Sequence, residues 1–307
     1  MDLKQIEYFV KVAELGSFTR AASLLGVAQP ALSRQVGLLE AELKLPLLVR
    51  NGRGAAPTEA GRLLLEHGQG ILHQVSRARE ELDRLGGALV GRVAIGLPTS
   101  IAKVITVPIT KAFRLALPQS SLAVTEGLSS FLEEALVTGR IDIALLYNVR
   151  SRKEIKATPL IEEQLYLVRS IKHSQQQHSN RRSKGDAKGL VEIADLAGFD
   201  IITPTKPNAI RMMIELALIE LDLTPRIVLE IDGVAAILDL VEQGVGVAVL
   251  PRNAVTTSPN PLLFEAIPIK GFKTQVSLAL SSQRPSTLTQ KAMIGLINDA
   301  TKTYLTH

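Results

Sequence analysis

The residues of this 307-residue chain that could recognise another molecule gather at the start of one short helix. Ala31, Ser33, Arg34 and Gln35 lie on the polar face of that helix, opposite an apolar face. Arginine and glutamine offer hydrogen-bond donors whose geometry fits base edges in the major groove of DNA, and small neighbours allow close entry. The pattern therefore indicates a helix that reads a nucleic acid duplex. A generic helical bundle with a solvated polar face is the alternative that periodicity leaves open.

Three helices are expected to position these side chains. Apolar residues from Ile6 to Ala13 recur at helical spacing after the N-cap Asp2, and Ser17 caps a second helix behind a glycine. Gly26 then breaks the chain, and Pro30 sits near the first turn of the third helix, where proline is tolerated. Two short helices joined by a tight turn containing glycine predict a helix-turn-helix.

The stretch after the third helix, residues 45–58, predicts two short extended pieces around Asn51–Gly54. They form a wing in which Arg50 and Arg53 would face the sugar–phosphate backbone or the minor groove. Residues 15–57 carry five basic and two acidic side chains, so this face is expected to be locally positive.

A single long helix is predicted from Thr58 onward. Its apolar residues recur at alternating spacings of four and three, which is the pattern of a coiled-coil seam. The seam consists of Leu64, Gly68, Ile71, Val75, Ala78, Leu82, Leu85 and Leu89. From Thr58 to Leu85 the helix is roughly 40 Å long, so a small N-terminal domain would leave the seam uncovered. A second copy of the chain is the expected partner, and packing on the C-terminal domain is the alternative.

From residue 91 the pattern changes to strands alternating with helices, which predicts a parallel α/β sheet. Two such runs follow each other, and the chain crosses between them near 163–168 and back near 265–272. We therefore expect two lobes separated by a cleft.

Two segments of the first ninety residues, YFVKVAELGSFTRAASLLGVAQPALSRQVGLLEAELKLPLLVR and GRGAAPTEAGRLLLEHG, resemble the DNA-binding module of LysR-type transcriptional regulators. Within that family AQPALS, GRIDIALLY and EEQLYLV are similar to the nitrogen assimilation control type. The resemblance implies a winged helix-turn-helix and a dimerising linker helix. By position, it assigns DNA contacts to Ser17, Thr19, Arg20, Gln29, Pro30, Ala31, Ser33, Arg34, Arg50 and Arg53.

The resemblance also covers residues 91–307, where the family is similar to periplasmic solute-binding proteins and VEQGVGVAVLP is a hallmark of the second lobe. The fold class is thus α/β overall, with a periplasmic-binding-protein-like, Rossmann-like effector domain. The implied domains are 1–58 for DNA binding, 59–90 for the linker helix and 91–307 for regulation. Lobe I would comprise about 91–165 and 268–307, and lobe II about 166–267.

Ligands of open α/β sheets bind beyond the carboxyl ends of the strands, where helix N-termini suit an anion. This rule gives a candidate effector pocket of Pro98, Thr99, Ser100, Leu128, Ser129, Thr203, Pro204, Asp232 and Gly233. The alternative interpretation is that the hydroxyl groups are only helix caps.

Composition excludes several classes of protein. The chain has no cysteine, which excludes a disulfide framework, a thiolate zinc site, an iron–sulfur cluster and a cysteine nucleophile. No apolar run is long enough to span a membrane, and the charged N-terminal residues do not fit a secretory signal, so a cytoplasmic protein is expected. The net charge of +5 owes much to the polar stretch 171–190, which has five basic residues and one acidic residue. We expect that stretch to be a flexible surface loop.

The sequence contains no G-x-S-x-G, H-E-x-x-H or G-x-x-x-x-G-K-[ST] motif, so we expect no enzyme activity, no cofactor and no metal. The resemblance predicts a sequence-specific DNA-binding transcriptional regulator whose dimers, paired into a homotetramer, bind operator half-sites. A small-molecule effector, for which an organic anion is a candidate, would act from the cleft, and RNA polymerase would be a further partner. The alternative is a small-molecule binding protein or enzyme with an N-terminal helical dimerisation module.

Overall fold

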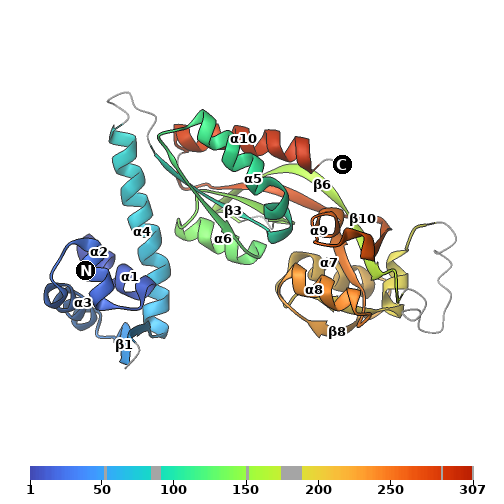
Figure 1. Ribbon diagram of the computed structural model, residues 1–307, viewed down its shortest axis with the longest axis horizontal. Coiled ribbons are helices and arrows are strands. Elements are labelled where there is room, and N and C mark those ends of the chain that lie inside the picture. Colours follow the sequence, from blue (N-terminus) through green and yellow to red (C-terminus); the bar gives the residue numbers. More distant parts are fainter. Residues whose placement is uncertain (52–53, 84–90, 150–151, 174–188, 285, 306–307) are drawn as a thin grey trace. The chain divides into compact units, whose positions relative to one another are not determined.

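The computed structural model describes the chain except for residues 52–53, 84–90, 150–151, 174–188, 285 and 306–307 (Figure 1). Most of the predicted polar loop 171–190 therefore lies outside the described residues. The chain divides into two compact units, one formed mainly by Met1–Gly91 and the other by Arg92–Leu136 with Asp142–His307.

The first unit has the predicted helices and wing. Its elements are α1 (Leu3–Leu15), α2 (Phe18–Leu25), α3 (Gln29–Leu43), β1 (Leu48–Asn51), β2 (Gly54–Pro57) and α4 (Glu59–Asp83). The predicted caps are confirmed, since Asp2 accepts a hydrogen bond from the Gln5 amide and Ser17 accepts one from the Arg20 amide. The core beneath the three helices includes the fully buried residues Phe9, Leu32 and Leu39.

Helix α4 is partly covered within its own unit. Gly68 lies against Val10 and Ile6 of α1, so closely that a Cβ at Gly68 would be 3.0 Å from Val10 Cγ2. The expectation that the unit leaves the whole seam uncovered is therefore wrong for its first turns, because α1 packs there. Further along, Leu82 is 66% exposed, and Leu63 on another side of the helix is 59% exposed. The seam positions 85 and 89 lie outside the described residues.

The second unit contains one six-stranded sheet, a two-stranded sheet and the helices that cover them. Its elements are β3 (Arg92–Leu97), α5 (Thr99–Ala116), β4 (Ser121–Glu126), α6 (Ser129–Thr138), β5 (Ile143–Tyr147), β6 (Ile155–Ser170), a 3₁₀ helix (Ile193–Gly198), β7 (Asp200–Thr203), α7 (Ala209–Ile219), β8 (Arg226–Glu230), α8 (Val234–Glu242), β9 (Ala248–Pro251), α9 (Arg252–Thr256), a 3₁₀ turn (Pro261–Leu263), β10 (Phe264–Ser281) and α10 (Leu288–Tyr304).

The large sheet is mixed, which corrects the prediction of a parallel sheet. Its strand order is β4-β3-β5-β10-β6-β9, and only β3, β4 and β5 pair in parallel. The long strands β6 and β10 pair antiparallel with each other, because the chain crosses between the lobes along one and returns along the other. Strand β10 runs from Phe264 to Ser281 as one strand, with a register shift between Pro268 and Lys273.

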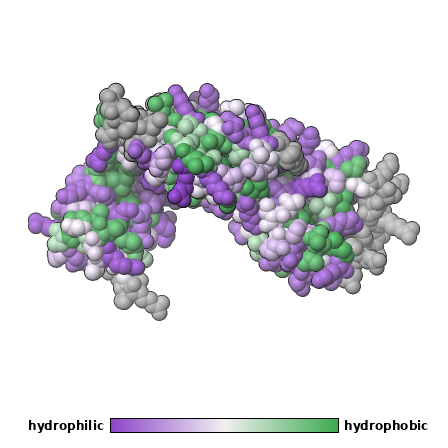
Figure 2. Space-filling view, turned by 45° about the horizontal axis from the view of Figure 1, so that its top comes forward, coloured by the Kyte–Doolittle hydropathy of each residue, from purple (hydrophilic) through white to green (hydrophobic). Residues whose placement is uncertain are grey.

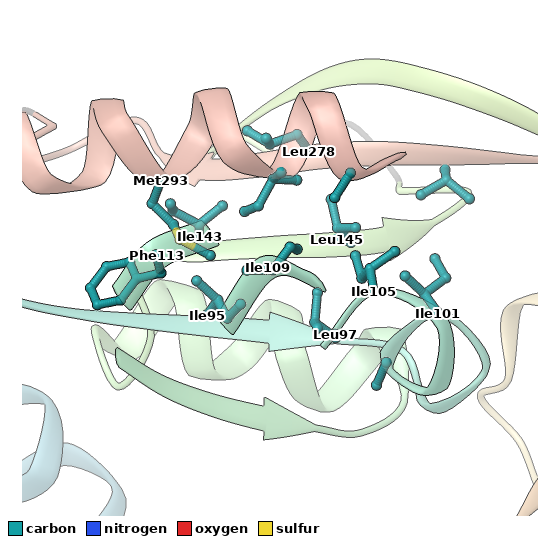
Figure 3. Packing of buried hydrophobic residues seen from close by; sticks show 14 of the residues in the cluster. Ile95, Leu97, Ile101, Ile105, Ile109, Phe113, Ile143, Leu145, Leu278 and Met293 are labelled. Carbon is teal, nitrogen blue, oxygen red and sulfur yellow. The ribbon is translucent and has the colours of Figure 1, made fainter. Parts of the chain in front are cut away.

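Each lobe has its own core. In lobe I, side chains from α5, β3, β5 and α10 point toward one another, among them Ile95, Ile105 and Met293 (Figure 3). The cores of lobe II take in Leu165, Ile269 and Phe272. Along β6 and β10 the cluster of one lobe gives way to the cluster of the other near residues 164 and 273.

Candidate nucleic-acid interface and effector cleft

Helix α3 packs on the core of the first unit with one side and exposes the other side to solvent. Leu32, Val36 and Leu39 are buried along one side of the helix, while Ala31 and Arg34 on the other side are exposed. The N-cap residue is an alanine that supplies no side-chain hydrogen bond, so the first turn keeps backbone amides unpaired by a cap.

The predicted contact residues of α3 differ in exposure. Pro30 is exposed, whereas Gln29 and Ser33 are half-buried. Arg34 forms no hydrogen bond or ion pair with any residue that the structure describes, which leaves its guanidinium available for an external partner. Gln35 accepts a long hydrogen bond of 3.5 Å from the Gln5 amide group, so its carboxamide is partly engaged within the unit.

Helix α2 places the other predicted residues of the motif. Ser17 is half-buried as its N-cap, and Thr19 and Arg20 are exposed on its first turn. The Arg20 guanidinium also donates to the carbonyl oxygen of Leu15, at the end of α1. This hydrogen bond holds the guanidinium beside the tight turn between α1 and α2.

The wing is attached to the helices at two points. Glu40 of α3 accepts hydrogen bonds from the amides of Leu47 and Leu48, at 2.7 and 3.0 Å, where the chain enters β1. At the other strand, the Ala55 amide donates to the Gly16 carbonyl oxygen at 2.9 Å. Gly54 has a φ of +140°, and a Cβ there would overlap the Gly16 oxygen, so only glycine fits.

The two acidic side chains of this face are paired within the first unit. Glu40 is occupied by the wing, and Glu42 contacts the N-terminal amine of Met1, so both acidic side chains of residues 15–57 are engaged. The backbone of Arg50 lies in β1. Arg53 lies outside the described residues.

In the second unit, a cavity of about 80 Å³ lies between the two lobes. Seven of the nine predicted effector residues line it, namely Pro98, Thr99, Ser100, Leu128, Ser129, Pro204 and Gly233. Local sequence patterns do not predict the other lining residues, which are Gly127, Tyr147, Asn208, Ala209, Ile210, Val234, Val249, Leu250 and Pro251.

The two remaining predicted residues, Thr203 and Asp232, do not line this cavity. Thr203 is buried, and its carbonyl oxygen accepts a hydrogen bond from the Ile231 amide. Asp232 accepts hydrogen bonds from the amide and the hydroxyl of Thr205, at 2.9 and 2.8 Å. Both residues therefore fix the loop that follows β7.

Four helices begin at the cavity. Thr99 opens α5, Ser129 opens α6, Asn208 caps α7 and Gly233 precedes α8. The residues before α5 and α8 provide no side-chain cap, and the lining contains no aspartate, glutamate, lysine or arginine. Unpaired amides and helix dipoles thus supply the positive potential of this cavity without a charged side chain.

A buried arginine holds the lobe II wall of the cavity. The Arg211 side chain is 7% exposed and donates to the Pro204 carbonyl oxygen at 3.0 Å. It also donates to Glu230 at 2.7 Å and to Glu215 at 3.0 Å. The hydrogen bond from Arg211 lowers the pKa of the Glu230 carboxyl, so the pair stays ionised and the Pro204 loop keeps its anchor.

A hydrogen-bond chain runs from the cavity into the strands that join the lobes. Ser100 and Tyr147 are 3.0 Å apart through their hydroxyl oxygens, and the Tyr147 hydroxyl donates to Glu163 Oε2 at 2.8 Å. The Asn253 amide donates to Glu163 Oε1 at 3.0 Å. Burial raises the pKa of Glu163 to about 7, although the hydrogen bond from Tyr147 acts in the opposite direction.

No described helix has the length and hydrophobicity needed to cross a bilayer, and the face shown in Figure 2 mixes hydrophilic residues with separate hydrophobic patches. A winged helix-turn-helix, a long helix and a two-lobed α/β unit with a cleft match the architecture of ligand-responsive DNA-binding regulators.

The particular family follows from comparison with known proteins. Residues 3–62 match the bacterial regulatory helix-turn-helix proteins of the lysR family, and residues 86–302 match the LysR substrate binding domain. The chain belongs to the LysR family of transcriptional regulators. This confirms the predicted fold class and function, and it does not favour the enzyme alternative.

The relatives agree with that assignment. The chain is 34% identical over 255 residues to the nitrogen assimilation regulatory protein Nac of Klebsiella aerogenes, which covers 83% of this chain and 79% of that protein. Its fold resembles the crystal structure of CbnR, a LysR family transcriptional regulator, with a TM-score of 0.70, 21% identity, and 98% and 99% of the two chains covered. CbnR complexed with its target DNA gives a TM-score of 0.68 at 21% identity, with 99% of each chain covered. The predicted resemblance to the nitrogen assimilation control type is confirmed by the first of these.

Proposed function

We propose that α3 reads operator DNA in the major groove. The observation that carries this proposal is the exposed Arg34, which pairs with no side chain in the described part of the structure, beside Ala31 on a helix whose opposite side is buried. Arg34 would donate to a base edge, and Gln29, Pro30 and Ser33 would lie against the same groove. Ser17, Thr19 and Arg20 would contact phosphate from α2, and Arg50 and Arg53 would do so from the wing.

A gel shift with the chain's own upstream intergenic DNA and a scrambled duplex tests this assignment. Arg34→Ala should cost about 1–3 kcal/mol on the operator, roughly 5- to 150-fold in affinity, and much less on the scrambled DNA. Arg114→Ala, an exposed arginine on α5 of the other unit, is the matched control and should bind like the wild type. An unchanged ratio of operator to scrambled affinity in Arg34→Ala would remove Arg34 as a base-reading residue.

The oligomer follows from the needs of operator half-sites. Exposed seam residues of α4, Ile71 and Leu82, would pack against a second copy, and two such dimers would form the homotetramer. Each dimer would then present two α3 helices to DNA, in the cytoplasm where the chromosome lies. RNA polymerase would be contacted by the DNA-bound assembly.

The cleft of the second unit would hold a small anionic effector. Four helix starts around an uncharged lining are the observation that supports an anion. The effector would act only through its different affinities for the alternative arrangements of the assembly. Footprinting on the operator with a set of small carboxylates tests this, and Thr99→Ala/Ser100→Ala should keep basal DNA binding and lose any response. Loss of basal binding in that variant would contradict the division of labour between the units.

A further inference from the structure

The hydrogen-bond chain of Ser100, Tyr147, Glu163 and Asn253 joins two cavities. Ser100 and Tyr147 line the effector cleft. Glu163 and Asn253 line a second cavity of about 790 Å³. The four side chains come from α5, β5, β6 and α9, so the chain connects both lobes through the strand that crosses between them.

The direction of the hydrogen bonds in this chain depends on the proton of Glu163. When the carboxyl is ionised, both oxygens accept, and the Tyr147 hydroxyl donates to Oε2. Tyr147 has one hydroxyl proton, so its oxygen then accepts the proton of Ser100. The Ser100 hydroxyl proton is thereby turned away from the cleft.

Protonation of Glu163 reverses the order. The Asn253 amide donates to Oε1, so the carboxyl proton resides on Oε2 and points to the Tyr147 oxygen. Tyr147 must then donate to the Ser100 oxygen, and the Ser100 proton leaves the chain. Because Ser100 lines the cleft on the first turn of α5, that proton becomes available to a ligand.

We propose that protonation of Glu163 reverses the hydrogen bonds through Tyr147 and gives the cleft an extra donor at Ser100, so that binding of a carboxylate there takes up a proton. The proposal rests on the cleft being the effector site. The lining has no charged side chain, so one added donor beside the uncapped start of α5 changes the affinity for an anion.

Both protonation states are accessible near neutral pH. Glu163 is 8% exposed, and its burial raises the pKa to about 7, while burial also raises the pKa of Tyr147, which keeps that hydroxyl protonated. Glu163 contacts Tyr147 of β5 and Asn253 of α9 and lies opposite Thr274 of β10. The titratable and charged groups that line the same cavity are Glu162 and Tyr166 of β6, Arg252 of α9 and Tyr304 of α10, and Lys273 precedes Thr274 in β10. Arg252 is exposed, and Glu162 is exposed and paired with Lys273, so water screens these charges from the buried carboxyl.

Tyrosine absorption reports the first half of the proposal. The chain has four tyrosines and no tryptophan, so its near-ultraviolet spectrum comes mainly from tyrosine. In the full chain the spectrum should change with a midpoint near pH 7 as Tyr147 switches from acceptor to donor. Tyr147→Phe and Glu163→Gln should abolish the spectral change. Tyr166 lines the second cavity beside Glu163 but takes no part in the hydrogen-bond chain, so Tyr166→Phe should retain the change. A change that survives in folded Glu163→Gln would overturn the proposal.

Acetate, a carboxylate small enough for the cleft, tests the second half. Saturation transfer to its methyl protons measures binding, and the dissociation constant should rise by up to about tenfold per pH unit above pH 7. In unbuffered solution at pH 7, added sodium acetate should cause uptake of about 0.5 proton per chain, which sodium chloride should not. Ser100→Ala should bind with a constant that no longer depends on pH.

The outcomes separate this inference from the proposed function. Acetate that binds with the same affinity at pH 6 and pH 8 would overturn the proton coupling and leave the cleft as an anion site. Acetate that does not bind at either pH would overturn the carboxylate coupling and the anionic effector together. The operator assay with Arg34→Ala would be unaffected by either result.

Discussion

The two recognition regions of this protein are built in opposite ways. The predicted contact residues of α3 are neighbours in sequence, and one helix is enough to expose Pro30, Ala31 and Arg34 together. The cleft brings together helix starts from Thr99 to Gly233, and its lining has no charged side chain. A DNA groove requires charged, protruding groups. A small ligand can instead be held by backbone amides that the fold fixes in place.

The two recognition regions also differ in the contacts that hold them in place. The wing is joined to α3 through the Glu40 carboxylate, and to the α1–α2 turn by the Ala55 amide and one glycine that cannot be replaced, Gly54. The cleft wall is held by the buried Arg211 guanidinium with its two carboxylate partners and by the hydrogen bonds at Glu163. Changes that remove these supports should therefore affect the two units separately.

The largest effect is expected from Gly54→Ala. The added Cβ would overlap the Gly16 carbonyl oxygen at a φ of +140°, so β2 must move, and we expect a loss of about 3 kcal/mol in the first unit. Gly37→Ala, on α3 with no atom within 4 Å of its Cβ, is the matched control and should be neutral or stabilising. Thermal unfolding of the full chain measures both. A Gly54→Ala protein as stable as Gly37→Ala would refute the close contact.

The next effect concerns the pH dependence of stability through Glu163. Its folded pKa of about 7 lies above the unfolded value of 4.5, so the folded chain holds the proton more tightly. The contribution is complete below pH 4.5 and is lost as the pH rises through about 7. The free energy of unfolding should fall by about 2 to 3 kcal/mol between pH 4.5 and 8 from this group, as followed by urea unfolding. Glu163→Gln should remove that slope and the exposed Glu162→Gln should keep it; equal slopes in all three proteins would contradict the assignment.

How much of each region could be predicted from the sequence depends on distance along the chain. The caps Asp2 and Ser17 and the proline of α3 act within one turn, so local patterns predict them correctly. Thr99 and Ser100 follow a strand directly, and the rule for open sheets predicts their place at the cleft.

The other features of the cleft depend on contacts between residues far apart in the sequence, which local patterns do not predict. Tyr147, Glu163 and Asn253 meet only because β6 and β10 run antiparallel between the lobes, where a parallel sheet was expected. Asp232 follows β8, at the carboxyl end of a strand where ligands of open sheets bind, but its carboxylate accepts hydrogen bonds from Thr205 instead. Thr205 and Asp232 are 27 residues apart along the chain, so local spacing cannot predict that this carboxylate is already paired.

A smaller effect is expected from Arg211→Met in the cleft wall. It would leave the Pro204 carbonyl and two carboxylates without their buried guanidinium, and we expect a loss of about 2 kcal/mol in urea unfolding. Arg226→Met removes an arginine that is 62% exposed and paired with Asp200, and should cost less than about 1 kcal/mol. Equal losses in the two variants would show that the Arg211 cluster does not support the wall.

The smallest effect is expected from Arg53→Ala in the wing. If Arg53 contacts only phosphate, its loss should weaken operator and scrambled DNA by the same factor, since phosphates carry no sequence information. The slope of log affinity against log salt should decrease by about one, as measured by gel shifts at several salt concentrations. Arg34→Ala should instead change the ratio between the two duplexes, so the pair of variants separates base reading from backbone contact. A change of that ratio in Arg53→Ala would mean that the wing also reads sequence, and base recognition would then extend beyond α3.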